Sequence, residues 1–431
     1  MKDFFKFAER GTSYKTETLA GITTFLSIAY ILIVNPIILS QSGMDHGAVF
    51  TATALTAIIG TLLMGILANF PIAIAPSMGL NSFFTFSVCI GMGIDWQVTL
   101  TGVFVAGIIF MILSLFKIRE KIINMIPIDL KYAIAAGIGF FITFIGLKNG
   151  GIVVGNPDTF VSIGNLTSPM TLLAVLGIII TTILLVKGIN GGIFYSMVIT
   201  TIVGMIFGLI DVPSSVVGSI PSIEPTFGVV FGHLDEMFTP EMLTVIFTFL
   251  IVAFFDTAGA LIGLTSQAGM MKDNKIPNIG KGLLADSAAG VIGAVLGTST
   301  PATSVESSAG IAVGGKTGFT SVVIAACFIV ALFFSPLVSV ISVEVTSAAL
   351  IIVGALMAME IRRINWTKLE IVIPAFLTII MMPLTSSVVI GIGLGFVLYP
   401  MCLVAQKRTK EVHPMMYVLC VLFLLYFAFI V

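Results

Sequence analysis

The amino-acid sequence predicts an all-α integral membrane protein with about fourteen transmembrane segments. Of its 431 residues, 58% are hydrophobic and 10% are charged, whereas soluble domains carry about 25% charged residues. Apolar runs at residues 19–36, 48–68 and 98–116 have close to the ~20 residues that a helix needs to cross the hydrocarbon layer. The lipid bilayer is therefore the first partner that the composition predicts.

The apolar runs form two sets, separated by a polar, proline-bearing stretch at residues 211–241. The first set is expected near residues 17–36, 47–70, 78–93, 97–117, 131–147, 168–187 and 191–210. The second set is expected near residues 243–266, 281–297, 305–315, 319–341, 344–360, 368–384 and 387–405. Because each set has an odd number of spans, the two sets must have opposite orientations in the membrane. A last apolar run, residues 413–431, either spans the bilayer or lies along its surface.

The distribution of basic residues agrees with this order, because cytoplasmic loops of membrane proteins collect Lys and Arg. With a cytoplasmic N-terminus, strict alternation places every Lys and Arg except Lys148 in an interior loop. Exterior loops instead carry acids such as Asp45, Asp95 and Asp158. We therefore expect a protein of the cell (plasma) membrane with its N-terminus inside. The net charge of −1 argues against a nucleic-acid partner.

Two short apolar stretches are each interrupted by a proline. Pro76 is followed five positions later by Asn81, and Pro301 is followed five positions later by Glu306. A membrane helix broken at depth leaves backbone N–H and C=O groups unpaired, so a break is tolerated only where protein or a water-filled cavity satisfies them. Broken segments at corresponding places in two halves indicate the binding site of a transporter.

Three acidic residues lie within predicted spans, where a carboxylate costs about 2.5–3.5 kcal/mol at the helix centre. Asp256 lies in the middle of its span, Glu306 directly follows the second break, and Asp286 lies nearer a span end. For each acid the alternative is a structural hydrogen-bonded carboxyl, and Asp286 is also placed to cap a helix. Hydroxyls that can line a wet cavity surround Glu306: Thr298, Ser299, Thr300, Thr303, Ser304, Ser307 and Ser308.

Other sequence patterns argue against an enzyme. Residues 310–317, GIAVGGKT, match the P-loop pattern, but a P-loop needs a preceding buried strand in a soluble α/β domain, and this run closes a short membrane segment. The four cysteines stand singly in apolar segments, and the three histidines lie far apart. We therefore expect no metal site, no cofactor and no catalytic constellation.

Four segments of the chain resemble the nucleobase-cation symporter-2 (nucleobase:ascorbate transporter) superfamily, and in particular its AzgA-like branch of adenine, guanine and hypoxanthine permeases. They are TETLAGITTFLSIAYILIVNP at 16–36, APSMGLNSFF at 75–84, FFDTAGALIG at 254–263 and GTSTPATSVESSAGI at 297–311. The resemblance implies fourteen spans in two inverted seven-span repeats. It also implies that the third and tenth spans are short helices preceded by antiparallel strands, here near residues 72–76 and 299–302.

The same resemblance implies two domains that the chain builds from alternating parts. A core domain comprises residues 16–118 and 242–341, and a gate domain comprises residues 119–210 and 342–406. Residues 211–241 form an extracytoplasmic linker between them. Residues 407–431 add a C-terminal basic loop and the extra apolar segment. The sequence leaves open whether the protein pairs as a homodimer.

By resemblance, Glu306 corresponds to the tenth-span residue that hydrogen-bonds the nucleobase, and Asp256 to the eighth-span carboxylate at the same pocket. Asn81 matches the third-span polar position, and Asp286 matches a ninth-span acid. The remaining expected substrate-binding residues flank these positions and are Ser82, Phe83 and Val305. For Phe83 the alternative is packing rather than stacking on the substrate.

With every Lys and Arg in a loop, the expected pocket holds acids and hydroxyls, which suits a neutral purine better than an inorganic anion. We therefore predict import of hypoxanthine, guanine or adenine by proton symport, with Asp256, Glu306 and Asp286 as proton-coupling residues. The alternatives are sodium coupling and a transporter of the same fold for anions or for uracil and xanthine. A channel or a non-transporting nucleobase sensor is the alternative from a different functional class.

Overall fold

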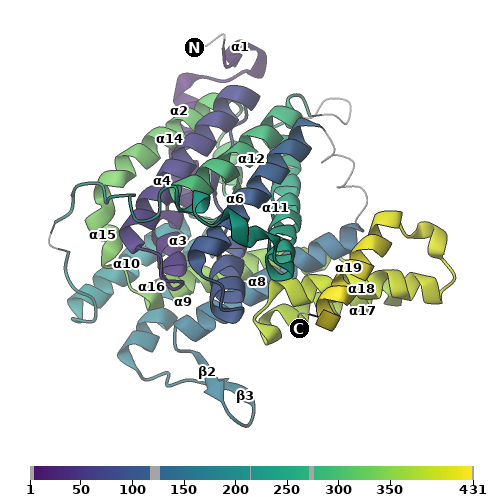
Figure 1. Ribbon diagram of the computed structural model, residues 1–431. Coiled ribbons are helices and arrows are strands. Elements are labelled where there is room, and N and C mark those ends of the chain that lie inside the picture. Colours follow the sequence, from purple (N-terminus) through teal and green to yellow (C-terminus); the bar gives the residue numbers. More distant parts are fainter. Residues whose placement is uncertain (1–3, 117–126, 214, 271–275, 430–431) are drawn as a thin grey trace.

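The computed structural model describes residues 4–116, 127–213, 215–270 and 276–429, which are mostly helical (Figure 1). Within these residues, nine helical segments have the length and apolar composition to cross a membrane, and shorter apolar helices accompany them. The protein is thus a helical membrane protein, whereas the count of fourteen spans and the inverted repeat stay predictions. Several basic residues assigned to cytoplasmic loops lie outside the described residues: Lys2, Lys117, Arg119, Lys121, Lys272 and Lys275.

The first half of the chain runs from the N-terminal helix to the end of α10. Its helices are α1 (Phe7–Arg10), α2 (Tyr14–Ile28), α3 (Ile31–Ser40), α4 (His46–Leu63), α5 (Met78–Ser82), α6 (Trp96–Leu115), α8 (Ile128–Asn149), α9 (Pro169–Val186) and α10 (Gly192–Ile206). The π-helical segments η1 (Met64–Ala68) and η2 (Phe83–Gly91) extend α4 and α5. The strands of this half are β1 (Ile74–Pro76), β2 (Val153–Asn156) and β3 (Phe160–Ile163).

The second half begins after residues 211–241 with a long helix. Its α-helices are α11 (Pro240–Gln267), α12 (Ile279–Leu296), α13 (Ser307–Ala312), α14 (Gly318–Ala331), α15 (Ser335–Ser339), α16 (Val343–Ala358), α17 (Leu369–Thr385), α18 (Val388–Ala405) and α19 (Pro414–Phe429). Its strand is β4 (Pro301–Thr303). The short 3-10 turns are η3 (Val229–Phe231), η4 (Leu234–Phe238), η5 (Leu332–Phe334), η6 (Met359–Arg363) and η7 (Thr409–Glu411).

Helices from both halves pack around the pair of strands β1 and β4. Helix α4 contacts α3, α12 and α14, and α12 also contacts α6. A second group consists of α8 against α16 and α17, with α9, α10 and α18 alongside. Figure 1 shows the first group mainly in the upper part of the view and the second group mainly below it. Glycines allow close packing in the second group, because a Cβ on Gly139 of α8 would lie 2.6 Å from the carbonyl oxygen of Gly354 in α16.

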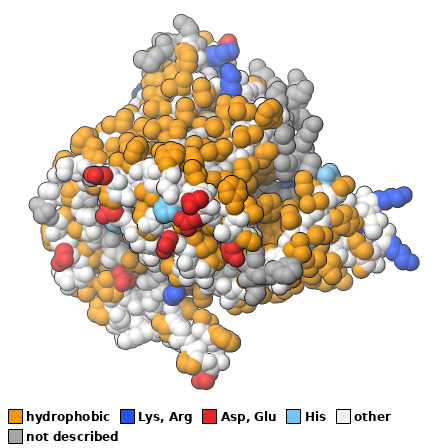
Figure 2. All heavy atoms as spheres, viewed as in Figure 1, with side chains coloured by type: hydrophobic (Ala, Val, Ile, Leu, Met, Phe, Trp, Pro, Cys, Tyr) orange, Lys and Arg blue, Asp and Glu red, His pale blue; other side chains and the backbone are white. Residues whose placement is uncertain are grey.

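The segment between the two halves lies across the ends of helices of the first group. The hydroxyl of Thr51 in α4 donates to the carbonyl oxygen of Pro221 at 2.8 Å. The N–H of Gly228 donates to the carbonyl oxygen of Val295 in α12, also at 2.8 Å. Figure 2 shows acidic side chains in the lower half of a largely hydrophobic face, and Lys and Arg mostly at the top and right edges. Most acidic and basic side chains therefore gather in different parts of this face, and the orientation of the chain in the membrane stays a prediction.

The apolar run after residue 413 forms α19, which packs against α18. The ring of Phe423 in α19 lies 5.8 Å from that of Phe396 in α18 and 6.1 Å from that of Phe247 in α11. The opposite face of α19 carries the exposed apolar side chains of Val418 and Leu422. Helix α19 therefore joins α18 to the helix that carries Asp256.

Candidate functional site

The two proline-broken stretches meet as short antiparallel strands. In the pair β1 and β4, Ile74 lies opposite Thr303 and Pro76 lies opposite Pro301. Beyond the prolines the pairing continues, because the N–H of Ser77 donates to the carbonyl oxygen of Thr300 at 3.1 Å. Strand β4 begins two residues later than the expected position 299. Strand β4 begins there because its antiparallel partner β1 ends at Pro76, which lies opposite Pro301.

Hydroxyl side chains satisfy the backbone that the break exposes. The N–H groups of Ile72, Ala73 and Ile74 donate, each at 3.0 Å, to the hydroxyl oxygens of Ser321, Ser307 and Thr61. Helices α14, α13 and α4 supply these three acceptors, so the strand is held by side chains rather than by water. The hydroxyl-rich sequence around the second break is thus partly a structural requirement of the broken backbone.

Glu306 lies between β4 and α13 and is held by two hydroxyl groups. The Tyr30 hydroxyl donates to Glu306 Oε1 at 2.6 Å, and the Ser304 hydroxyl donates to Oε2. Tyr30 is itself only 3% exposed and stands at the break between α2 and α3. Hydrogen bonds to a carboxylate are about twice as strong as neutral ones. The Glu306 side chain is therefore fixed from two sides.

Asp256 and Asp286 lie near Glu306 and are also held by hydroxyls. Ser77, at the start of α5, donates to Asp256 Oδ2 at 2.6 Å. Asp286 is 2% exposed and accepts from Thr257 at 2.8 Å and from Thr303 in β4 at 3.4 Å. Thr257, which donates to Asp286, directly follows Asp256 in α11. The structure thus brings the three predicted acids together at the strand pair, with hydrogen-bonded neighbours from both halves of the chain.

Asn81 lies in a separate buried network. Its side-chain N–H donates to Asn35 Oδ1, and Asn35 in turn donates to Thr53 at 2.7 Å and to Thr298 at 2.9 Å. All four residues are fully buried. The Asn81 Oδ1 atom has no hydrogen-bond partner among the described residues. An unpaired buried carbonyl oxygen costs about 1–3 kcal/mol, so this oxygen is a candidate for an interaction made in another state of the protein.

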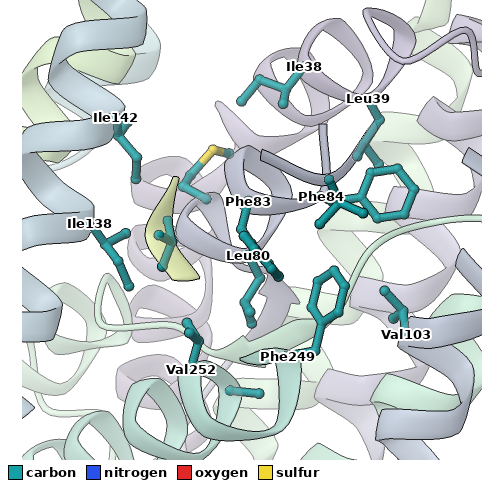
Figure 3. Close-up of a cluster of buried hydrophobic side chains, with 14 of the residues drawn as sticks. Ile38, Leu39, Leu80, Phe83, Phe84, Val103, Ile138, Ile142, Phe249 and Val252 are labelled. Carbon is teal, nitrogen blue, oxygen red and sulfur yellow. The ribbon is translucent and has the colours of Figure 1, made fainter. Parts of the chain in front are cut away.

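The other three predicted substrate-binding residues are placed differently from one another. Phe83 is fully buried and packs edge-on against Phe249 of α11, with ring centroids 4.9 Å apart. Figure 3 shows both rings inside a hydrophobic cluster, with Ile138 of α8 nearby. Ser82 is buried and its hydroxyl has no partner among the described residues. Val305 is 58% exposed beside Glu306. Packing therefore accounts for Phe83, and Val305 borders open space.

Sequence reasoning missed Tyr30, Ser77 and Asn35 as residues of this site. Tyr30 and Asn35 are isolated polar side chains in a run of otherwise apolar residues, and that contrast was the available signal. Ser77 directly follows the first proline, in the position where a broken helix restarts. Each has a partner in the second half of the chain, 179 to 276 positions away in sequence. No local pattern identifies contacts of that range.

A helical membrane protein with two broken segments that meet at buried acids belongs to the permease class and is not an enzyme. A sequence model described as "Permease family" (Xan_ur_permease) matches residues 15–394 of the chain. The chain therefore belongs to this family, the nucleobase:ascorbate transporters. The resemblance recognised from the sequence is confirmed.

Relatives are similar over essentially the whole chain. The guanine/hypoxanthine permease PbuG of Bacillus subtilis is 55% identical over 100% of both chains. The adenine permease AdeP of Escherichia coli is 42% identical, over 99% of this chain and 95% of its own. Among solved structures, the transmembrane domain of the cyanobacterial bicarbonate transporter BicA matches with a TM-score of 0.64 and 18% identity, over 88% of this chain and 97% of that one. The last likeness concerns the fold alone.

Proposed function

We propose that this protein imports purine nucleobases across the cell membrane together with protons. The names of the similar permeases, which specify guanine, hypoxanthine and adenine, support the substrate class. The observation that carries the proposal is the convergence of Asp256 and Glu306 at the junction of β1 and β4, each acid with a hydroxyl donor from the other half of the chain.

The chemistry of this junction suits a neutral bicyclic ring. Ring N–H groups of a purine donate to carboxylate oxygens, while its ring nitrogens or C6 oxygen accept from N–H and hydroxyl donors. Buried carboxyl and hydroxyl groups reject analogues that leave them unpaired. The exposed side chain of Val305 marks the side from which we propose that the ring reaches Glu306.

Proton coupling is proposed for the same acids. A carboxyl that binds substrate in one access state and faces water in the other can take up a proton on one side and release it on the other. Asp256 and Glu306 are the proposed carriers. Asp286 is the proposed third member because it accepts from Thr257, which directly follows Asp256, and from Thr303 in β4. Sodium is the rival coupling ion, since carboxylate and hydroxyl oxygens also coordinate that cation.

Alternating access is proposed to move the core, residues 16–118 and 242–341, against the gate, residues 119–210 and 342–406. The contact between α5 and α8 lies on this boundary. A Cβ on Gly79 of α5 would approach the Ile138 side chain of α8 to 2.8 Å, so Ile138 packs directly on the α5 backbone. We propose that this apolar contact shifts when one domain moves against the other.

The test is uptake of labelled hypoxanthine into proteoliposomes under an imposed pH gradient, with and without sodium. We expect accumulation that follows the pH gradient and does not require sodium. Glu306→Ala should abolish binding, whereas Asp256→Asn should retain binding and lose pH-dependent accumulation. Asp158→Asn, in the exposed loop between β2 and β3, is the matched control and should transport normally. Uptake that ignores the pH gradient would refute proton coupling.

A competition series separates the alternative cargoes. The fold likeness to a bicarbonate transporter favours an anion as the second candidate. Unlabelled hypoxanthine, guanine and adenine should each displace labelled hypoxanthine, whereas bicarbonate, uracil and xanthine should not. Downhill flux without accumulation would instead identify a channel, and binding without flux would identify a sensor.

A further inference from the structure

The carboxylate of Glu17, near the start of α2, is fully buried and accepts five hydrogen bonds. Its Oε1 accepts from the Thr12 hydroxyl at 2.8 Å and from the Lys316 N–H at 3.0 Å. Its Oε2 accepts from Thr317 twice, from the N–H at 3.2 Å and the hydroxyl at 2.8 Å, and from the Thr320 hydroxyl at 2.6 Å. Four of the five donors lie at the beginning of α14.

Three of these donors, on Lys316 and Thr317, belong to the run GIAVGGKT at residues 310–317, whose sequence matches the P-loop pattern. The N-terminus of a helix presents free N–H groups and favours an anion. Helix α14 has 14 residues, and the anion at its N-terminus is the carboxylate of Glu17. The run therefore forms an anion-binding site, and the carboxylate of Glu17 occupies this site.

The chain segment of residues 306–317 connects Glu306 to the site at which Glu17 binds. From Glu306 it runs through α13 to Thr317 alongside α2, which contacts α13 and α14. At its start Tyr30 binds Glu306, and at its end Glu17 binds the Thr317 backbone. Between these ends Gly310 packs so closely on α2 that an added Cβ would overlap the Thr24 hydroxyl. Helix α2 holds this segment at Glu17 and Thr24, and Tyr30, two residues beyond the end of α2, holds it at Glu306.

We propose that Glu17 is a positioning residue for Glu306, holding the far end of the α13 segment on α2 so that the substrate-binding carboxyl stays in register with Tyr30. This inference rests on the proposed function, because it assigns Glu306 to the substrate. Glu17 itself lies at the other end of α2, about 20 Å along a helix path of 13 residues, and acts on the substrate only through the segment.

A single substitution disrupts the Glu17 site without changing its shape. In Glu17→Gln one oxygen becomes an NH₂ group, which donates only. The hydroxyls of Thr12, Thr317 and Thr320 can rotate and accept, but the backbone N–H groups cannot. The Lys316 N–H points at one carboxylate oxygen and the Thr317 N–H points at the other. In either orientation of the new amide, its NH₂ group therefore faces a backbone N–H, and two donors oppose each other. The end of the segment should therefore detach.

Two readouts test the proposal on the full-length protein. The first is the Kd of labelled hypoxanthine for the purified protein, which should rise about tenfold in Glu17→Gln, equivalent to about 1.4 kcal/mol. The second needs no ligand. A cysteine at position 305, in a chain without the four native cysteines, should react with a maleimide at a rate that Glu17→Gln changes by at least about threefold.

Matched variants separate positioning from general destabilisation. Ser196→Ala removes a buried hydroxyl that accepts from Thr181 at 2.7 Å between α9 and α10, and should change neither readout. In a Tyr30→Phe background, Glu17→Gln should add less than about twofold to Kd, because the register between Tyr30 and Glu306 is already lost. Thr320→Val removes one donor and supplies a milder variant if Glu17→Gln does not fold.

The outcomes are distinct. The proposal would be overturned if Glu17→Gln lowered only the melting temperature and left both the Kd and the labelling rate within about twofold of wild type. It would also be overturned if Glu17→Gln raised the Kd as much in the Tyr30→Phe background as in the wild-type protein. If the wild-type protein binds no purine, the proposed function fails, and the labelling rate at position 305 still decides whether Glu17 positions the segment.

Discussion

Removal of the Tyr30 hydroxyl is the sharpest test of the Glu306 geometry. Tyr30→Phe deletes one oxygen atom and leaves the ring, which is 97% buried, in place. The deleted group donates to Glu306 Oε1 at 2.6 Å. A hydrogen bond to a charged group contributes about 1.5–3 kcal/mol. If that energy holds Glu306 in its binding position, affinity for hypoxanthine should fall by about one to two orders of magnitude.

The assay is equilibrium binding of labelled hypoxanthine to purified protein, followed by uptake in proteoliposomes. Tyr417→Phe is the matched control, because the Tyr417 hydroxyl makes a long, exposed bond of 3.4 Å to the Thr409 carbonyl oxygen in the C-terminal region. Its Kd should equal that of wild type. A Kd for Tyr30→Phe within about twofold of wild type, in protein that melts normally, would refute a role for this bond in substrate binding.

Three further predictions concern stability. Gly310→Ala should destabilise the protein by about 1–3 kcal/mol, because the new Cβ overlaps α2, whereas Gly263→Ala in open space should be neutral or stabilising in the same thermal melt. Asn35→Ala should lower the unfolding free energy by about 2–4 kcal/mol, since it strips partners from a fully buried network, and an unchanged melting curve would contradict this. Arg408 donates to Glu411 and lowers the pKa of this carboxyl, so the stabilisation is present at neutral pH and is lost as the pH falls through the lowered pKa. Because this pair is exposed, Glu411→Gln should shift the melting temperature at pH 7 by no more than about 1 °C.

The sequence predicted the class and the breaks of this fold because those features are local. Apolar runs of bilayer length appear as helices, and prolines 76 and 301 lie in the strands β1 and β4. The acids were found because a carboxyl in an apolar run is conspicuous by itself. The number of spans and the inverted repeat depend on how helices sit in the membrane, which local patterns do not fix.

The partners of the acids were not predictable in the same way. Tyr30 and Ser77 stand out little in sequence, and the acids that they bind are 276 and 179 positions away. Asn81 likewise has a partner that no local pattern indicates. Its side-chain N–H donates to Asn35 in a fully buried network, and its contact with substrate stays a prediction.

Three of the bonds to buried carboxyls share one property, which bears on how the two halves assemble. Tyr30 to Glu306, Ser77 to Asp256 and Glu17 to Thr317 each join the first half of the chain to the second. The first half donates to Glu306 and Asp256, and the second half donates to Glu17, whereas Asp286 accepts from Thr257 and Thr303 of its own half. A buried carboxyl that loses a hydrogen-bond donor inside the bilayer is costly. Glu306, Asp256 and Glu17 therefore favour association of the two halves in the membrane.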